Sequence, residues 1–227
     1  MVTIAISLFL QALGGEPMEH VKRYHSASMV VNGKELLIEG PITGRYLADL
    51  RFDEGLKAFR IPEQQHEALI EIADLPEGRI IIAREGDLVL GYVTFLHPDP
   101  LERWSMAKLP DLLELGAIEI SHKVRAGGVA KKLLEVAFMD DAMEDYVIIT
   151  TEYYWHWDLK GTGLDVWQYR KVMEKVMGSV GLTWMATDDP EICSHPANCL
   201  MAKIGKRVPA ETIVAFDAMR FQNRFLY

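Results

Sequence analysis

The segment E-L-G-A-I-E-I-S-H-K-V-R-A-G-G-V-A-K-K-L-L, residues 114–134, decides the fold. Residues 114–120 predict a strand, and apolar residues at i, i+4 spacing from Val129 onward predict a helix. Between them, residues 125–130 are mostly small, so a ligand can approach the backbone closely. The first N–H groups of a helix have no partner inside it, which makes this loop a candidate site for a diphosphate. The alternative is a helix whose small first turn only packs against the sheet.

Hairpins are predicted before this segment. Residues 29–38 form two apolar runs joined by Asn32-Gly33, which is a typical hairpin signal. A helix is predicted from Pro62 to about residue 76, where a Pro-Glu-Gly sequence ends it. Residues 79–83 and 88–96 then predict two antiparallel strands around a tight turn.

Strands and helices are predicted to alternate after the segment. Residues 146–151 predict a buried strand, residues 166–180 a helix and residues 182–186 a final strand. Residues 197–204 and 209–223 are both predicted to be helical. Hairpins followed by alternating elements predict an α/β protein with a mixed sheet, antiparallel in its first half and parallel near the loop.

The composition excludes several classes of protein. Lys and Arg number 24 against 33 Asp and Glu, and a net charge of −9 argues against a nucleic-acid partner. An apolar content of 49% with 25% charged residues is typical of a globular chain, not of a disordered or multi-span membrane protein. Two cysteines are too few for a disulfide framework and suit a reducing compartment such as the cytoplasm. No membrane partner is expected.

Three parts are expected along the chain: an N-terminal extension over residues 1–28, a central domain over residues 29–187, and a C-terminal helical extension over residues 188–227. Residues 1–13 are apolar, but no Lys or Arg precedes them, which disfavours a signal peptide. Polar residues recur there every four positions and predict an amphipathic helix. The alternative is a segment added by an upstream translation start.

The strand beginning at Glu114-Leu115, the loop R-A-G-G-V-A at residues 125–130 and the following helix resemble motif A of the GNAT acyl-CoA N-acetyltransferases. Longer strings resemble the AcuA family of acetoin-utilisation acetyltransferases from Gram-positive bacteria, and this resemblance covers about residues 38–227. The strings include D-E-G-L-K-A-F-R at 53–60, P-E-Q-Q-H-E-A-L at 62–69, V-T-F-L-H-P-D-P-L-E-R-W at 93–104, M-D-D-A-M-E-D-Y at 139–146, T-T-E-Y-Y-W-H-W-D-L-K-G-T-G-L at 150–164 and T-D-D-P-E-I at 187–192.

The resemblance implies a GNAT-like fold, in which a mixed, mostly antiparallel sheet is splayed at the cofactor site and flanked by helices. Residues 29–187 would then be the acyl-CoA-binding catalytic domain. The implied activity is transfer of acetyl from acetyl-CoA, without a metal, to a lysine of acetyl-CoA synthetase, which lowers the activity of that enzyme. A homodimer remains open.

The resemblance also assigns binding residues by position. It places the pantetheine arm of CoA against the backbone of Ile120 and Ser121. It assigns the pyrophosphate to Arg125, Ala126, Gly127, Gly128, Val129, Ala130 and Lys131. The family usually has Gly where this chain has Ala126.

Glu114 occupies the family position of a general base that acts directly or through water. A base is needed because a lysine amine, with a reference pKa of about 10.4, must lose a proton before it attacks a thioester. The carboxylates that remain as alternatives are Glu102, Glu119, Glu152 and Asp158.

The proton donor for the leaving thiolate is not evident. In many family members it is a Tyr four residues before the Gly that ends the helix, and counting back from Gly181 gives Met177. The tyrosines that remain as candidates are Tyr153, Tyr154 and Tyr169.

Cys193, His195 and Cys199 lie within seven residues and could suggest zinc, but the fourth ligand that structural zinc requires has no candidate at metal-ligand spacing. We therefore expect no metal. We expect the thiols to be buried, and Ser194 or His195 to cap a helix.

Two other functions remain open. One is acetylation of a small amine such as a polyamine or amino sugar, and the other is a CoA-sensing module that binds its partner without turnover.

Overall fold

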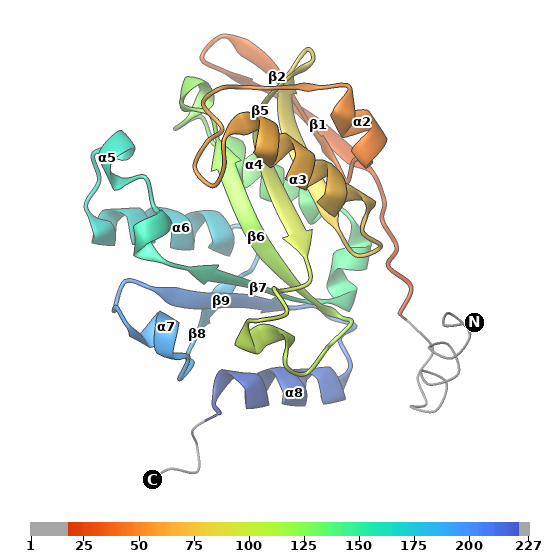
Figure 1. Cartoon of the computed structure of the whole chain (residues 1–227), viewed down its shortest axis with the longest axis vertical. Coiled ribbons are helices and arrows are strands. Elements are labelled where there is room, and N and C mark those ends of the chain that lie inside the picture. Colours follow the sequence, from red (N-terminus) through yellow and green to blue (C-terminus); the bar gives the residue numbers. More distant parts are fainter. Residues whose placement is uncertain (1–17, 223–227) are drawn as a thin grey trace.

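The computed structural model describes residues 18–222, and a nine-stranded sheet runs through this part of the chain in the order β1-β2-β4-β5-β6-β7-β9-β8, with β3 beside β5 (Figure 1). The predicted amphipathic helix of residues 1–13 lies outside the described residues. The strands are β1 (His25–Val31), β2 (Lys34–Gly40), β3 (Arg51–Phe52), β4 (Arg79–Glu85), β5 (Leu88–Leu96), β6 (Leu112–Ile120), β7 (Val147–Glu152), β8 (Thr183–Met185) and β9 (Cys199–Ile204). The helices are α2 (Gly44–Ala48), α3 (Pro62–Asp74), α4 (Val129–Ala137), α5 (Leu159–Thr162), α6 (Val166–Gly178), α7 (Pro190–Cys193) and α8 (Ala210–Arg220).

The predicted hairpin is present as β1 and β2. Asn32 and Gly33 both have positive φ angles, of 52° and 77°, as the two central residues of a type I′ turn require. Strand β1 begins at His25, which pairs with Gly40, so the boundary expected at residue 28 falls inside this strand.

Strands β6 and β7 form the parallel pair expected near the loop. They are paired only from Leu112 to Glu114 of β6, which lie beside Val147 to Ile149 of β7. Beyond Glu114, strand β6 continues to Ile120 against β5 alone, and β7 continues to Glu152 against β9 alone. A register shift between β5 and β6 leaves Gly116 without a partner at this point. The two strands therefore separate, and Figure 1 shows them running in clearly different directions. The predicted mixed, splayed sheet is confirmed.

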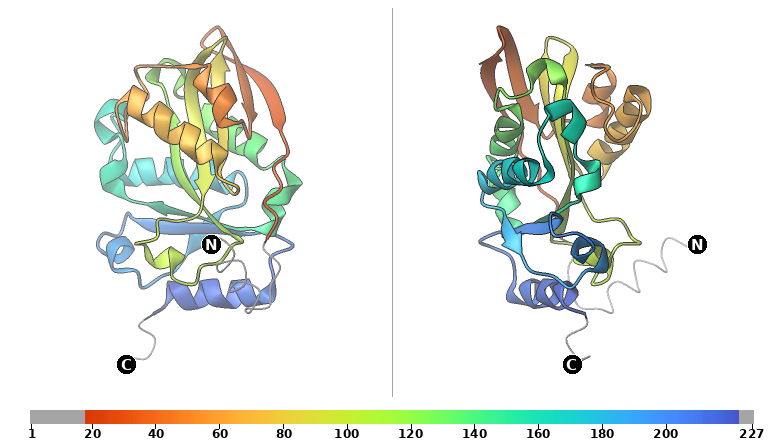
Figure 2. Two further views of the ribbon diagram at one scale, coloured as in Figure 1. Left: turned by 45° about the vertical axis from the view of Figure 1, so that its right-hand side comes forward. Right: turned by 90° about the vertical axis from the view of Figure 1, so that its left-hand side faces the viewer.

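Helices cover both faces of the sheet (Figure 2). Helices α2 and α3 lie on one face, where Leu69 of α3 packs with Ile80, Ile82 and Tyr92. Helices α4 and α6 lie on the other face. There α4 buries the apolar side that its i, i+4 spacing predicted, including Val129 and Leu133. The apolar pattern predicts which side of α4 is buried, but not against which strands it packs. The loop before α4 is thereby held against the sheet where β6 and β7 separate.

Residues 199–204 form a strand, so the prediction of a helix over residues 197–204 is wrong. Strand β9 lies between β7 and β8, and Cys199 to Ala202 are all buried. A short run that is buried on both faces shows no strand alternation, so its pattern cannot be told from that of a helix.

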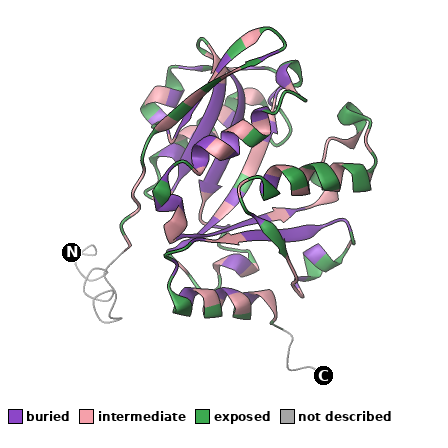
Figure 3. Ribbon diagram, turned by 180° about the vertical axis from the view of Figure 1, so that it is seen from behind, coloured by how far each residue is buried: buried purple, intermediate pink, exposed green. Residues whose placement is uncertain are grey.

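Figure 3 shows the buried residues concentrated in the central strands, while α6 and α8 are largely exposed on their outer sides. Within residues 18–222, no helix combines the length and the apolar character needed to cross a membrane.

Candidate active site

A cavity of about 670 Å³ opens where β6 and β7 separate. Its walls are the free part of β6, the end of β7, the loop before α4, and the inner side of α6. The sequence-predicted residues that line it are Ile120, Arg125, Ala126, Gly128, Val129, Ala130 and Lys131. Strand separation and the small-residue loop therefore contribute to one and the same cavity.

The loop has the open amides that the sequence predicted. Gly128 is the N-cap of α4, has φ of 80° and provides no side chain to cap the helix. The N–H groups of Val129, Ala130 and Lys131 donate to no residue in the described part of the chain. Three free amides at the positive end of a helix are a suitable site for a phosphate group. Ala126 has φ of 61°, a conformation that favours glycine, which explains why the family usually has Gly there.

Gly127 and Ser121 do not line the cavity, but each is adjacent in the chain to residues that do. A Cβ atom on Gly127 would lie 2.2 Å from Cγ1 of Val31, so only glycine fits between the loop and β1. Ser121 is fully buried, and its Oγ donates to Oδ1 of Asp53 at 2.6 Å. The Ser121 N–H donates to Leu90 and its carbonyl accepts from Val124, so its backbone is already occupied. Sequence reasoning missed Val31 and Asp53 because both are distant in the chain from the loop and carry no local signal.

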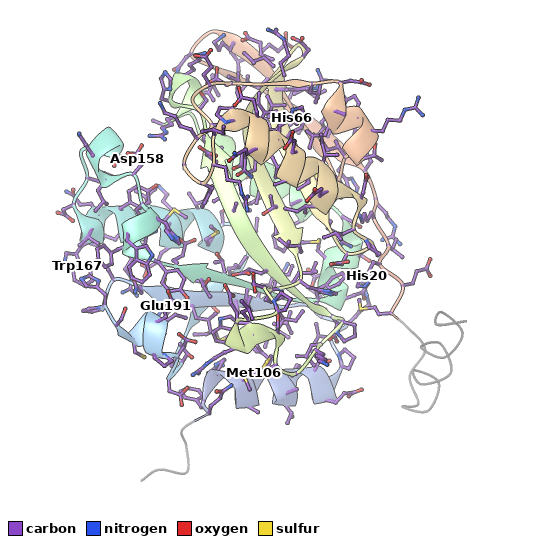
Figure 4. The ribbon with its side chains drawn as sticks, in the orientation of Figure 1. His20, His66, Met106, Asp158, Trp167 and Glu191 are labelled. Atoms are coloured by element: carbon purple, nitrogen blue, oxygen red, sulfur yellow. The ribbon has the colours of Figure 1, made fainter. Side chains whose placement is uncertain are left out.

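The two basic residues of the loop differ in their surroundings. Arg125 pairs with Asp158 and donates from Nε to the carbonyl of Ile120 at 3.1 Å, which ties the loop to β6 and to the start of α5. Asp158 is labelled in Figure 4, just before α5. Lys131 has an exposed side chain whose ammonium is 3.7 Å from Glu135. Lys131 is thus the freer cation near the open amides.

Glu114 lies on β6 at the last residue paired with β7. Its side chain is half-buried, lies on the face of the sheet opposite α4, and is not among the residues that line the cavity. Thr151 Oγ1 donates to Glu114 Oε1 at 3.1 Å, and Thr151 itself lines the cavity. Burial raises the pKa of Glu114 to about 7, and the nearby carboxylates of Glu102 and Asp99 act in the same direction. A carboxyl group with this pKa can accept a proton near neutral pH.

Two of the alternative carboxylates, Glu119 and Asp158, have hydrogen-bond or ion-pair partners within the fold. Glu119 accepts hydrogen bonds from the N–H of Ala58 and the hydroxyl of Tyr92, both at 2.7 Å, and so holds residue 58 beside the cavity. Asp158 is paired with Arg125, and this partner lowers the pKa of its carboxyl. Burial and neighbouring acidic groups raise the pKa of Glu102, which is not among the residues that line the cavity.

Glu152, the last residue of β7, lines the cavity and is only 8% exposed. Its carboxyl accepts from Trp157 Nε1 at 3.1 Å and from Thr150 Oγ1 at 3.4 Å. Across residues 18–222 no cation forms an ion pair with it, and burial raises its pKa to about 7. The sequence presented Glu152 only as one alternative base, because nothing local indicates that it faces a cavity.

The candidate proton-donating tyrosines are dispersed. Tyr153 and Tyr169 line the cavity, and burial raises the pKa of both. Tyr154 lies away from the cavity lining and packs on His195 with ring centroids 4.2 Å apart. Met177, near the end of α6, is fully buried in the core.

The segment with two cysteines has ordinary structural roles. Cys199 is buried in β9, whereas Cys193 is exposed at the end of α7, so the expectation of two buried thiols is wrong for Cys193. His195 Nδ1 accepts from the N–H of Ala197 at 3.1 Å. Within the described ranges no three His, Cys, Asp or Glu side chains are grouped as metal ligands.

A mixed sheet whose central parallel pair separates beside a helix with open N-terminal amides is the GNAT-like arrangement that the sequence resemblance implies. No protein-family profile matches the chain. The chain belongs to the family of the acetoin utilization protein AcuA: it is 59% identical over 210 residues to AcuA of Bacillus subtilis, a match that covers 92% of this chain and all of that protein. The AcuA of Bacillus licheniformis is 60% identical over the same shares. The crystal structure of an acetoin utilization protein from Exiguobacterium sibiricum superposes with a TM-score of 0.89 at 57% identity, over 91% of this chain and 98% of that one.

Proposed function

We propose that the chain is a protein-lysine N-acetyltransferase that uses acetyl-CoA. One observation carries this proposal: β6 and β7 separate beside three open helix amides, and a carboxyl group with a pKa of about 7 lies where the separation begins. A diphosphate, an extended amide-bearing arm and a thioester are the parts of acetyl-CoA that such an arrangement would accommodate.

The residues present fit CoA. The amides of residues 129–131 and the Lys131 ammonium would hold the pyrophosphate, with Gly128 and Ala126 giving the loop its left-handed turns. Gly127 brings the loop close to the sheet in a space that a Cβ atom would fill. The Leu115 carbonyl accepts a hydrogen bond from Thr150, but from residue 116 to 119 β6 has no strand on its β7 side, so its backbone groups on that edge could pair with the pantetheine amides. Acetyl-CoA would supply an activated acetyl thioester there.

Glu114 would act as the general base, directly or through water. The lysine amine would approach from the face of the sheet that carries Glu114, opposite the face of α4. With a pKa of about 7, Glu114 is ionised in a substantial fraction of molecules at neutral pH and can accept the amine proton. Asp99 and Glu102 add negative charge on that side and would attract a cationic lysine.

We further propose that the protein substrate is acetyl-CoA synthetase, that acetylation lowers its activity, and that the reaction takes place in the cytoplasm. The support for this partner is the family resemblance and the acetoin utilization name of the relatives. Trp155, 45% exposed at the end of β7, is an aromatic side chain suited to anchoring a protein partner.

The test is to incubate the purified protein with labelled acetyl-CoA and acetyl-CoA synthetase, and to map the label by mass spectrometry. Label on one synthetase lysine is expected, together with a fall in synthetase activity. Gly128→Glu should abolish both, because the carboxylate would repel a diphosphate at the open amides. Transfer to polyamines or amino sugars but not to synthetase would establish the small-amine alternative, and transfer to neither would refute acetylation.

A second candidate, CoA sensing without turnover, is favoured by one observation: the position of the usual proton-donating tyrosine is taken by Met177, which is fully buried. Glu114→Gln separates the two. If the variant still inhibits synthetase while acetylation is lost, binding alone regulates the partner.

A further inference from the structure

Among the carboxyl groups that line the cavity, Glu152 has no ion-pair partner in the described residues and no part in the general-base chemistry proposed for Glu114. Glu152 ends β7 on the cavity side, and its neighbours in the strand alternate between the two faces. Thr150 and Glu152 lie on the face of the sheet that carries α4 and α6, whereas Thr151, which also lines the cavity, reaches Glu114 on the opposite face. The two carboxyl groups are therefore on opposite sides of the gap between β6 and β7.

We propose that Glu152 donates a proton to the CoA thiolate as it leaves, an inference that rests on the proposed acetyl transfer. The thioester would lie in the gap, with the amine and Glu114 on one side. On the other side, the departing sulfur would face the cavity wall that contains Glu152.

The surroundings of Glu152 favour its protonated form. Burial without a cation disfavours a carboxylate, and this effect outweighs the hydrogen bonds from the two neutral donors, Trp157 and Thr150, which favour the ionised form. The groups that face it are also neutral or compensated: Tyr169 from α6, Cys199 from β9, and the Arg125–Asp158 pair from the loops. Its pKa of about 7 lies below the value of about 8.5 for an ordinary thiol, so the proton moves toward the stronger base.

The tyrosines are less suitable donors. Burial raises the pKa of Tyr153 and Tyr169, so each is a weaker acid than an unperturbed tyrosine. The Tyr169 hydroxyl interacts with the backbone of Asp158, and the Tyr153 hydroxyl interacts with Thr151 on the Glu114 side. Tyr154 does not line the cavity.

The step balances without another reactant. The carbon–sulfur bond of the thioester breaks, and its electron pair stays on sulfur. The O–H bond of Glu152 then breaks and an S–H bond forms, which leaves CoA as the thiol and Glu152 as a carboxylate. Glu152 regains a proton from water when the products leave and the cavity fills.

The first experiment measures kcat against pH for Glu152→Gln, with Glu211→Gln as the matched control because Glu211 is exposed on α8, far from the cavity. The wild-type profile should rise as Glu114 ionises and fall as Glu152 loses its proton. Glu152→Gln should lower kcat at pH 7 about 100-fold and abolish the fall, with KM for acetyl-CoA nearly unchanged. A wild-type rate and profile in Glu152→Gln would overturn the proposal.

The second experiment needs no turnover. The thiol of bound CoA is titrated through the ultraviolet absorbance of its thiolate, in the wild-type protein and in Glu152→Gln. An ionised Glu152 beside the sulfur should raise the thiol pKa in the wild type above that in the variant. Identical titrations would overturn this inference alone. If CoA does not bind the wild-type protein, the acetyl-transfer function fails and this inference fails with it.

Discussion

The two faces of the sheet where β6 and β7 separate differ in a way that the amino-acid types do not reveal. Each face presents one glutamate whose pKa burial raises to about 7. Glu114 is half-buried, bonded to Thr151, and close to the carboxylates of Glu102 and Asp99. Glu152 is almost fully buried and has only neutral donors, Trp157 and Thr150.

Similar pKa values therefore arise from different surroundings, and the surroundings suit different roles. The face that carries Glu114 has further carboxylates nearby and can receive a cationic amine. On the other face, burial without a cation favours the protonated form of Glu152 until a stronger base, such as a thiolate, is next to it. Each of the following experiments changes one face and leaves the other as a reference.

The largest effect is expected for Glu114→Gln, which removes the proton acceptor from the face of the sheet opposite α4. We expect kcat for acetyl transfer to fall by about 100- to 10,000-fold, while CoA affinity measured by calorimetry stays within about threefold, because Glu114 does not line the cavity. Glu102→Gln serves as the control on the same face, and its loss of activity should be far smaller. A Glu114→Gln variant with wild-type kcat would contradict the assignment.

Glu152→Gln should change the pH dependence of stability. The folded-state pKa of Glu152, about 7, is above its unfolded value of 4.5, so the native state binds the extra proton and loses stability as pH rises through this interval. The Glu152→Gln variant does not lose this stability, because glutamine does not ionise. At pH 8, relative to pH 4.5, the variant should gain up to about 3 kcal/mol over the wild type in its free energy of unfolding. Urea denaturation at both pH values measures this, and parallel pH profiles would contradict it.

Gly127→Ala should disturb only the cavity face. Its Cβ atom would lie 2.2 Å from Cγ1 of Val31, so the loop has to move and the open amides move with it. We expect the Kd for CoA to rise about tenfold, and the added substitution Val31→Ala to restore most of the affinity by making space. Val31→Ala alone is the control. Unchanged affinity in Gly127→Ala would show that the loop does not hold CoA.

The smallest effects compare two adjacent threonines. Thr151→Val removes a hydrogen bond that lowers the pKa of Glu114, so the rising limb of the kcat–pH profile should move to higher pH by less than one unit. Thr150→Val removes a hydrogen bond that lowers the pKa of Glu152, so only the falling limb should move upward. If both variants shift the same limb, one carboxyl group controls the whole profile.

Local pattern predicted most elements correctly. The Asn32-Gly33 hairpin, the helix from Pro62 and the strand, loop and helix around Arg125 all have signals within a few residues. Residues 197–204 had no such signal, because a short strand buried between two others has the composition of a helix. The cavity residues were predicted where the loop supplies them. From the sequence, Glu152 was considered only as an alternative base. Its side chain faces a cavity because β6 and β7 separate, and the sequence around Glu152 does not indicate this separation.

The sequence by itself determined the loop that lines the cavity and the open amides of α4, because these depend on residue types adjacent in the chain. The tertiary structure decided where β9 lies, which glutamate faces which side, and what charge surrounds each one. Those properties depend on burial and on neighbours that the chain brings together from distant positions, such as Val31 beneath Gly127 and Asp53 beneath Ser121. Local sequence encodes a conformation, whereas a pKa depends on the whole environment of the group.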